Sequence, residues 1–257
     1  MQMTGRTVLI TGGTSGIGFE LARQLSLRGN TVIITGRDRN KLEVAQRTLT
    51  GVSVIESDVS KPEDVGRLYD VLLSQFPKLN VLVNNAGIMR NIKLDEQSQL
   101  ADLTTEIDAN LKGPMWMIQT FLPLLRQQKD ALIVNVSSGL AFVPFPAAPI
   151  YSASKAAMHA YTRCLRIQLE RSGVSVVELA PPGTETPLFR NEFAEEMKGE
   201  KGMDVKDLVR HAIAGIEAGK SEIRPGLSNV LKIASRVAPH LMFKQMVRLS
   251  RPKPAVA

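Results

Sequence analysis

Two residues have the types and spacing needed for proton transfer. Tyr151 and Lys155 are four positions apart, so on a helix their side chains are neighbours on one face. A nearby ammonium favours phenolate over phenol, and lowering a tyrosine pKa from about 10 to about 7 requires roughly 4 kcal/mol of differential interaction. Ser138, which ends an apolar strand-like run, can hold a substrate oxygen. The trio indicates general acid/base chemistry, although a Tyr-x-x-x-Lys spacing alone also occurs on solvated helices.

A glycine-rich turn near the start of the chain is typical of a site for dinucleotide phosphates. It follows a strand-like run and enters a helical segment, which is the context that such a site requires. Gly12 permits the tight turn, Gly16 lets the backbone approach a pyrophosphate, and Gly18 lets the helix pack closely. An ordinary turn between a strand and a helix needs no such set of glycines. The expected contacts are Gly12, Thr14, Ser15, Gly16, Ile17 and Gly18.

The elements that must position these residues follow from the alternation of apolar runs and helical-period segments. Strands are expected near 7–11, 31–35, 52–56, 80–84, 131–136 and 174–179, and helices near 16–28, 39–48, 62–76, 99–128, 151–172 and 204–218. This alternation gives βαβ units and a parallel sheet, and the continuous apolar runs suit strands covered on both faces. The expected fold is α/β: a doubly wound Rossmann-type parallel sheet of about seven strands with helices on both faces, in a single domain. Ligands then bind beyond the carboxyl ends of the strands.

The order of these motifs, with an Asn-Asn-Ala-Gly turn at 84–87, resembles the short-chain dehydrogenase/reductase family over residues 5–187. The resemblance implies an oxidoreductase that uses NADP (NADPH), with NAD as the alternative, to interconvert an alcohol and a ketone or aldehyde. Tyr151 would be the general acid/base, and Lys155 would lower its pKa and hold the nicotinamide ribose. Ser138 would orient the carbonyl, and Asn110 would complete a proton relay.

The residues after the second strand favour NADP. Thr35-Gly36-Arg37 has no acid to bind the free ribose 2′-hydroxyl of NAD, and Arg37 suits a 2′-phosphate, although a merely solvated arginine is the alternative. By resemblance Asp58 contacts the adenine, with helix capping as its alternative role. The remaining cofactor contacts implied by the resemblance are Val59, Asn85, Ala86, Gly87, Pro181, Thr184 and Thr186, together with Tyr151 and Lys155.

The segment after the sixth strand departs from the family pattern. The family usually shows Pro-Gly-x-Val-x-Thr, whereas residues 181–186 read Pro-Pro-Gly-Thr-Glu-Thr, so Pro182 replaces the glycine. Residues 187–203 are expected to form a flexible substrate lid. An apolar substrate pocket, with simple packing as the alternative, is expected from Met89, Phe142, Val143, Phe145, Leu188, Phe189 and Phe193.

Composition bounds the class of protein. The chain has 257 residues, of which 44% are hydrophobic, enough for one sizeable core. Its one cysteine, Cys164, permits no internal disulfide and is expected to be a small apolar residue on a packed helix. Because neither a signal-type segment nor a run of membrane-spanning length is seen, a cytoplasmic protein is expected. A small-molecule substrate and no metal site are expected.

Two long helical segments, 99–128 and 151–172, carry more apolar residues than one covered stripe needs. Helices at these positions pair across a two-fold axis in the family that the chain resembles. We therefore expect a homodimer, with a wider core-facing side as the alternative explanation.

The tail, residues 227–257, is separate from an expected catalytic domain of residues 1–226. It carries six Lys and Arg residues and no acid, which accounts for +6 of the net +7. Pro239 is expected to split it into two short helices. Such a basic amphipathic extension either packs its apolar side near the lid or makes weak contact with an anionic membrane. Nucleic-acid binding is not expected, because no recognition motif accompanies the charge.

The tail, the Phe-Val-Pro-Phe-Pro run at 142–146 and the Gly-Ile-Met-Arg run at 87–90 most resemble the DltE-type oxidoreductases within the family. The competing hypothesis is a non-catalytic NAD(P)-binding sensor or assembly subunit of a cell-envelope pathway of the D-alanylation type. The intact set of Asn110, Ser138, Tyr151 and Lys155 speaks against it, because a protein that only binds needs no acid/base.

Overall fold

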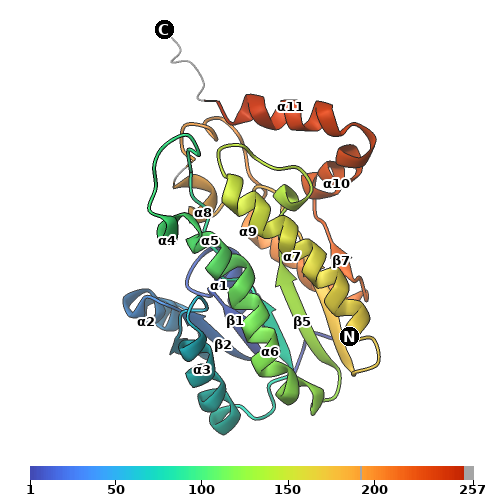
Figure 1. The fold of residues 1–257 in the computed structure, drawn as a ribbon. Coiled ribbons are helices and arrows are strands. Elements are labelled where there is room, and N and C mark those ends of the chain that lie inside the picture. The colour runs from blue at the N-terminus through green and yellow to red at the C-terminus, as the bar shows by residue number, and fades with distance from the viewer. Residues whose placement is uncertain (192, 252–257) are drawn as a thin grey trace.

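A seven-stranded parallel sheet forms the centre of the computed structural model, which describes residues 1–191 and 193–251 (Figure 1). The strand order is β3-β2-β1-β4-β5-β6-β7, and every neighbouring pair is parallel. The predicted doubly wound sheet is confirmed. The strands are β1 (Thr7–Thr11), β2 (Thr31–Gly36), β3 (Val52–Glu56), β4 (Val81–Asn84), β5 (Ala131–Val136), β6 (Val174–Leu179) and β7 (Glu222–Ile223).

Helices cover both faces of the sheet, because each central strand is apolar on both sides. The first face packs against α1 (Gly16–Leu27), α2 (Arg39–Thr48) and α9 (Val205–Glu217). The second face packs against α3 (Pro62–Gln75), α6 (Gly113–Arg126) and α7 (Pro149–Gln168). The strand order reverses between β1 and β4, so the turns that leave these two strands meet beyond their carboxyl ends.

The single long helix predicted over 99–128 is wrong. The chain instead forms α4 (Leu100–Leu103), α5 (Thr105–Ile107), a π-helical stretch (Asp108–Lys112) and then α6. The π-helical stretch contains Asn110, whose side chain bonds outside the helix, and local π geometry of this kind is frequent at functional sites. The expectation for Cys164 is also wrong, because this residue is exposed on α7.

The tail forms two helices, α10 (Leu227–Val237) and α11 (Pro239–Leu249), so the predicted division at Pro239 is confirmed. Met246 of α11 is buried in a third apolar cluster with Phe145, Tyr151 and Phe193. In Figure 1 the two helices lie beyond the carboxyl ends of the strands, at the top of the view. Within the described ranges, every helix is too short or too polar to cross a membrane.

Candidate active site

The structure brings Ser138, Tyr151 and Lys155 together beyond the end of β5. Their exposed fractions are only 9%, 7% and 3%. Ser138 is a hydrogen-bond partner of the Tyr151 phenol. The Lys155 Nζ donates to the Val136 carbonyl at 2.9 Å and lies 5.6 Å from the centre of the Tyr151 ring. The strand end and one face of α7 therefore hold the three side chains in a single buried group.

Asn110 joins this group through the turn that follows β4. Its Oδ1 accepts from the Ile88 N–H at 2.9 Å, and its Nδ2 donates to the Ile88 carbonyl at 2.9 Å and to Ser154 Oγ at 3.1 Å. A Cβ added at Gly87 would lie 3.1 Å from Asn110 Oδ1 and 3.6 Å from Lys155 Nζ. The predicted set of four residues thus converges beside Gly87.

Burial shifts the pKa of both titratable groups of the set toward the neutral form. Burial raises the pKa of Tyr151 to about 12, with the Ser138 hydrogen bond acting in the opposite direction and the charge of Glu106 raising it further. Burial lowers the pKa of Lys155 to about 8. The predicted lowering of the Tyr151 pKa is therefore wrong for the protein alone. The ammonium lies over the phenol ring and bonds to Val136, so desolvation outweighs its attraction for a phenolate.

The glycine turn between β1 and α1 has the backbone shape that a pyrophosphate site needs. Gly12 and Gly16 adopt φ values of +65° and +55°, which favour glycine. A Cβ added at Gly18 would lie 2.4 Å from the Gly12 carbonyl oxygen. Ser15 caps α1 without a side-chain hydrogen bond, which leaves the first N–H groups of Ile17 and its neighbours for a ligand. Thr14 lies in the same turn, and these residues fit a dinucleotide.

The turn after β4 is tied to the glycine turn. The Asn85 Nδ2 donates to the carbonyls of Thr11 and Gly12 at 2.9 and 3.0 Å. The N–H groups of Asn85 and Ala86 both donate to Thr11 Oγ1 at 3.0 Å. Thr11 was not predicted as a site residue, although its position at the end of β1 was a signal. The expected contacts Asn85 and Ala86 thus also brace the site.

The end of β2 presents Arg37 to solvent, and Arg37 makes no ion pair within the described chain. The neighbouring acid, Asp38, is occupied because its side chain accepts from the Lys41 N–H at 3.1 Å and caps α2. The Asp58 carboxylate accepts hydrogen bonds from the Ser60 N–H at 3.0 Å and from the Ser60 Oγ at 2.7 Å. Asp58 therefore braces a turn before α3. Val59 is buried in the core and lies against Gly113, and its contact with the adenine stays a prediction.

The segment after β6 is held mainly by its own contacts. Thr186 caps α8 (Pro187–Arg190), and a Cβ added at Gly16 would lie 3.2 Å from Thr186 Cγ2, so Thr186 lies next to the glycine turn. Thr184 is buried and donates to the Pro182 carbonyl at 2.8 Å, while the Pro181 carbonyl accepts from the Gly139 N–H at 2.7 Å.

The predicted lid also has internal contacts. Arg190 bonds Glu185 at 2.6 Å and the carbonyls of Met197 and Glu200 at 3.1 and 2.8 Å. The flexibility of this lid stays a prediction.

The predicted apolar pocket is largely packed core. Val143, Phe145 and Phe193 are at most 2% exposed, and the rings of Phe145 and Phe193 are 5.9 Å apart. Leu188 is 38% exposed, and Phe189 lies under the Arg190 guanidinium. Met89 and Phe142 are among the half-buried members of the same cluster. The packing alternative therefore holds for most of this set.

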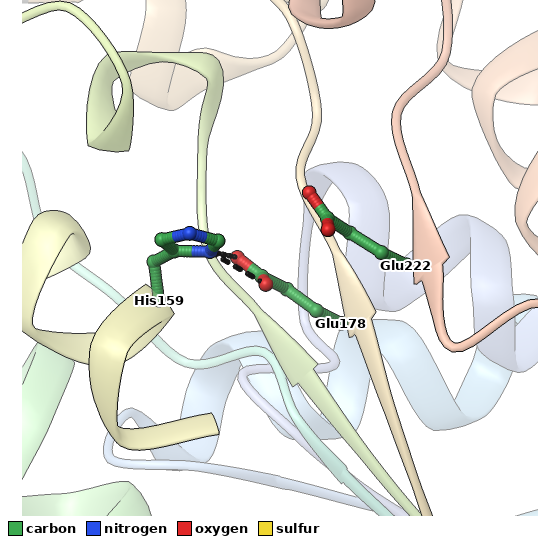
Figure 2. Close-up of side chains that lie close together, drawn as sticks. All are labelled: His159, Glu178 and Glu222. Atoms are coloured by element: carbon green, nitrogen blue, oxygen red, sulfur yellow. Dashed lines mark hydrogen bonds and ion pairs between the residues drawn. The ribbon is translucent and has the colours of Figure 1, made fainter. Parts of the chain in front are cut away.

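A buried polar network behind the site was missed by sequence reasoning (Figure 2). Glu178 on β6 is fully buried, accepts from Ser137 Oγ at 2.5 Å and lies 2.8 Å from His159 Nδ1. Glu222 on β7 has an oxygen within 4.8 Å of both, an arrangement that a metal ion can use. Lys232 and Arg224 already pair with the Glu222 carboxylate, so we regard the cluster as an ion-pair network. The only sequence signal for this network was the position of His159, which follows Tyr151 by two helical turns and Lys155 by one.

The comparisons with known proteins cover nearly the whole chain. A family model described as short chain dehydrogenase matches residues 6–197. The uncharacterized oxidoreductase DltE of Bacillus subtilis is 38% identical over 247 residues, 96% of this chain and 98% of the relative. An uncharacterized oxidoreductase of Staphylococcus epidermidis is 30% identical, over 86% of this chain and 97% of the relative.

Solved structures agree with this similarity. A short chain dehydrogenase from Burkholderia cenocepacia in complex with NADP has a TM-score of 0.82 and 26% identity, over 98% of this chain and 100% of the other. The 3-ketoacyl-(acyl-carrier-protein) reductase from Brucella melitensis, complexed with NADH, has a TM-score of 0.75 and 29% identity, over 84% of this chain and 91% of the other.

Proposed function

This chain belongs to the short-chain dehydrogenase/reductase family, close to DltE, and is an NAD(P)-dependent enzyme acting on CH–OH groups; we propose that it uses NADP to interconvert an alcohol and a ketone or aldehyde. The observation that carries the proposal is the buried group of Ser138, Tyr151 and Lys155 beside the glycine turn. A protein that only binds a dinucleotide has no use for a desolvated phenol hydrogen-bonded to a serine. The structural neighbours bind NADP in one case and NADH in another, so the choice of NADP rests on Arg37.

The residues divide the chemistry between binding and proton transfer. The glycine turn would hold the pyrophosphate, Arg37 the 2′-phosphate and Thr186 the nicotinamide end. Bound NADPH supplies the hydride. Ser138 holds the carbonyl oxygen of the substrate, and Tyr151 donates its proton to that oxygen as negative charge develops there. The Lys155 ammonium then returns a proton to the Tyr151 phenolate and regains one from solvent, while Asn110 holds the turn beside the Lys155 Nζ.

Replacement of the Tyr151 hydroxyl tests the proposal directly. Tyr151→Phe should lower the turnover of NADPH with a responsive carbonyl by at least about 100-fold, because only the proton-transferring oxygen is lost. NADPH affinity, measured by fluorescence titration, should stay within about twofold, since the ring that packs beside Lys155 remains. A panel of aliphatic and aromatic ketones, sugars and acyl compounds supplies the substrate.

Tyr161→Phe is the matched control, since Tyr161 lies on the same helix and outside the buried group. Turnover of Tyr151→Phe within tenfold of wild type would contradict the catalytic assignment. Tight NADPH binding by the wild type with no turnover across the panel would favour the sensor or assembly subunit instead.

The active form is proposed to be a homodimer. Several apolar residues of the two helical segments expected to pair are buried in the chain's own core, including Ile118, Phe121 and Met158. Trp116, Leu122 and Tyr161 are half-buried and pack at the edge of the second core cluster, and we propose that α6 and α7 supply the interface.

A further inference from the structure

The outer side of α10 is apolar, which is the reverse of an ordinary surface helix. Val230, Ile233 and Val237 recur at helical spacing and are 55%, 57% and 80% exposed. The opposite side holds the helix to the body: Ser228 is fully buried, Leu231 packs in the third apolar cluster, and Lys232 pairs with Glu222. Because the inner side holds the helix on the body, the exposed part of the outer ridge is free to meet a partner. A contiguous exposed apolar ridge of this kind marks a binding surface.

Basic side chains are exposed on the same two helices as this ridge. On α11 the inner residues Met242 and Met246 pack on the body, whereas Leu241, Lys244 and Arg248 are exposed on its outer side. Arg236 borders the ridge on α10, and an open depression beside it is lined by Arg224, Lys232, Ile233, Arg236 and Val237. Residues 227–251 contain no acid. The surface therefore combines exposed apolar groups with positive charge that no carboxylate on these helices offsets.

The charge identifies the partner. In a two-fold interface with a second copy, Arg236, Lys244 and Arg248 would face the same bases without an acid from these helices, which is unfavourable. Anionic phospholipid can bind both parts of this surface. Its phosphate groups would pair with the basic side chains, and its acyl chains would cover the apolar ridge. We propose that α10 and α11 bind the protein peripherally to membranes that contain anionic phospholipid. Each helix has 11 residues, so both would lie along the interface.

This inference goes beyond the proposed function and does not depend on it. The inner side of α11 packs in the cluster that contains Tyr151, so membrane binding would turn the catalytic end of the sheet toward the lipid. The inner side of the tail would pack on the body and its outer side would contact the membrane, so the two alternatives drawn from the sequence would both apply.

Sedimentation of the full chain with vesicles tests the proposal. Binding is expected at low salt to phosphatidylglycerol–phosphatidylcholine vesicles and not to pure phosphatidylcholine vesicles, and it should fall as salt shortens the screening length. Lys244→Glu/Arg248→Glu should weaken binding at least tenfold, since each base near the surface contributes about 1 kcal/mol and its reversal adds repulsion. Val230→Ser/Val237→Ser should also weaken binding, because the ridge loses its apolar side chains.

Lys78→Glu/Lys129→Glu is the charge-matched control, since both lysines are exposed on the body and outside the tail. It should keep at least half of the binding, and circular dichroism should show every variant folded. No sedimentation with anionic vesicles at low salt overturns the proposal, as does an equal loss in the control. A change of oligomeric mass in Val230→Ser/Val237→Ser would also overturn it, because the ridge would then be an interface between protein chains.

Discussion

Burial makes the charged form of each proton-transfer group unfavourable in the protein alone. Lys155 is 3% exposed, and its pKa falls to about 8, while that of Tyr151 rises to about 12. A Tyr151 phenol with this raised pKa is a weak acid at neutral pH, so we expect proton donation to follow the negative charge that develops on the substrate oxygen. The catalytic pKa is thus a property of the complex.

The buried ammonium predicts a pH-dependent stability. Between the folded pKa of about 8 and the ordinary value of 10.5, the unfolded chain binds more protons at Lys155, so the free energy of unfolding rises with pH there. The free energy of unfolding of the wild type, relative to that of Lys155→Met, should rise by about 3 kcal/mol from pH 7 to pH 10.5. Urea unfolding of both proteins without cofactor measures this. Lys129→Met, at an exposed position, should show no such trend, and a constant difference for Lys155→Met would refute the expected effect.

Cofactor choice is decided at Arg37. Arg37→Ala should weaken NADPH binding at least about tenfold, because a charge-assisted contact to the 2′-phosphate contributes about 1.5–3 kcal/mol. NADH affinity should change less than about twofold, since NADH carries no phosphate there. Fluorescence titration with both cofactors measures the ratio. Arg39→Ala is the matched control, because Arg39 is exposed and paired with Glu43; equal losses for NADPH and NADH would make Arg37 a surface charge.

Residue types and spacing were sufficient to find the buried set, because Ser138, Tyr151 and Lys155 lie on predictable elements. Residue types and spacing could not predict the Glu178 network, because nothing in the apolar run around Glu178 shows that this carboxylate will be buried against a helix. The sign of the Tyr151 pKa shift failed for a related reason. Sequence gives the neighbours of a group, whereas desolvation depends on everything that packs around it.

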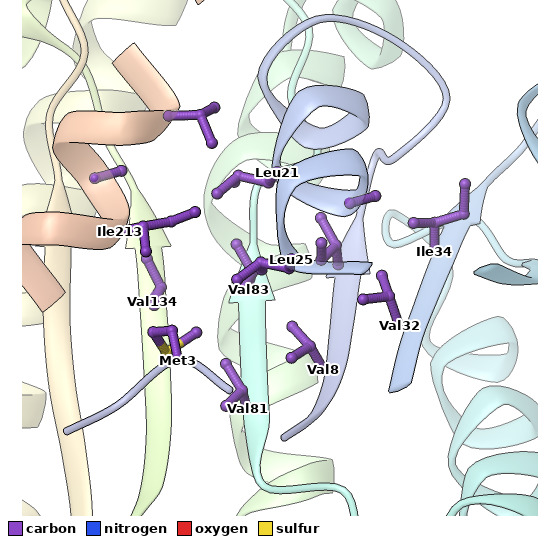
Figure 3. Packing of buried hydrophobic residues seen from close by; sticks show 14 of the residues in the cluster. Met3, Val8, Leu21, Leu25, Val32, Ile34, Val81, Val83, Val134 and Ile213 are labelled. Atoms are coloured by element: carbon purple, nitrogen blue, oxygen red, sulfur yellow. The ribbon is translucent and has the colours of Figure 1, made fainter. Parts of the chain in front are cut away.

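At the scale of elements, strands were the most predictable parts of the chain. Val8, Val32, Val81 and Val134 lie on four neighbouring strands and point to the same face, where Leu21, Leu25 and Ile213 of α1 and α9 cover them (Figure 3). Their neighbours Leu9, Ile33, Leu82 and Ile133 pack on the other face. Continuous apolar runs therefore predicted both the strands and their two covers. The division of the 99–128 segment was not predictable, because the side-chain bonds of Asn110 to Ile88 are tertiary contacts.

The network of Glu178 joins three elements at the catalytic end. Replacing Glu178 should therefore lower the stability of the fold. Glu178→Ala should lower the free energy of unfolding by about 3–5 kcal/mol, because Ser137, which directly follows β5, and His159 on α7 lose a fully buried partner. Glu178→Gln should cost less, since its amide can still accept the Ser137 hydrogen bond. Urea unfolding provides the measurement. Glu170→Ala, at an exposed position just after α7, should stay within about 0.5 kcal/mol of wild type, and an equally small effect at Glu178 would contradict the bracing role.

For the molecule as a whole, the functional groups are concentrated at one end. The glycine turn, the turn after β4, Ser138 and the tail all lie beyond the carboxyl ends of the strands, whereas loops and the N-terminal segment lie at the other end of the sheet (Figure 1). The fold class predicted this end as the ligand site. The amphipathic pattern of the tail predicted packing near the lid as one alternative, whereas the partners of Met246 and Lys232 in the body were not predictable from any local pattern.

Assembly should use the side of the molecule that this end leaves free. The outer face of α7 presents small residues, with Ala153, Ala160 and Cys164 exposed and Ala157 half-buried, so another helix can approach closely. Light scattering at micromolar concentration should give twice the chain mass of 28.1 kDa. Ala157→Arg should shift the protein to monomer, because a long charged side chain would be desolvated in the interface. Lys129→Arg should leave the mass unchanged. A wild-type monomer would refute the dimer, and a dimeric Ala157→Arg would place its interface away from α7.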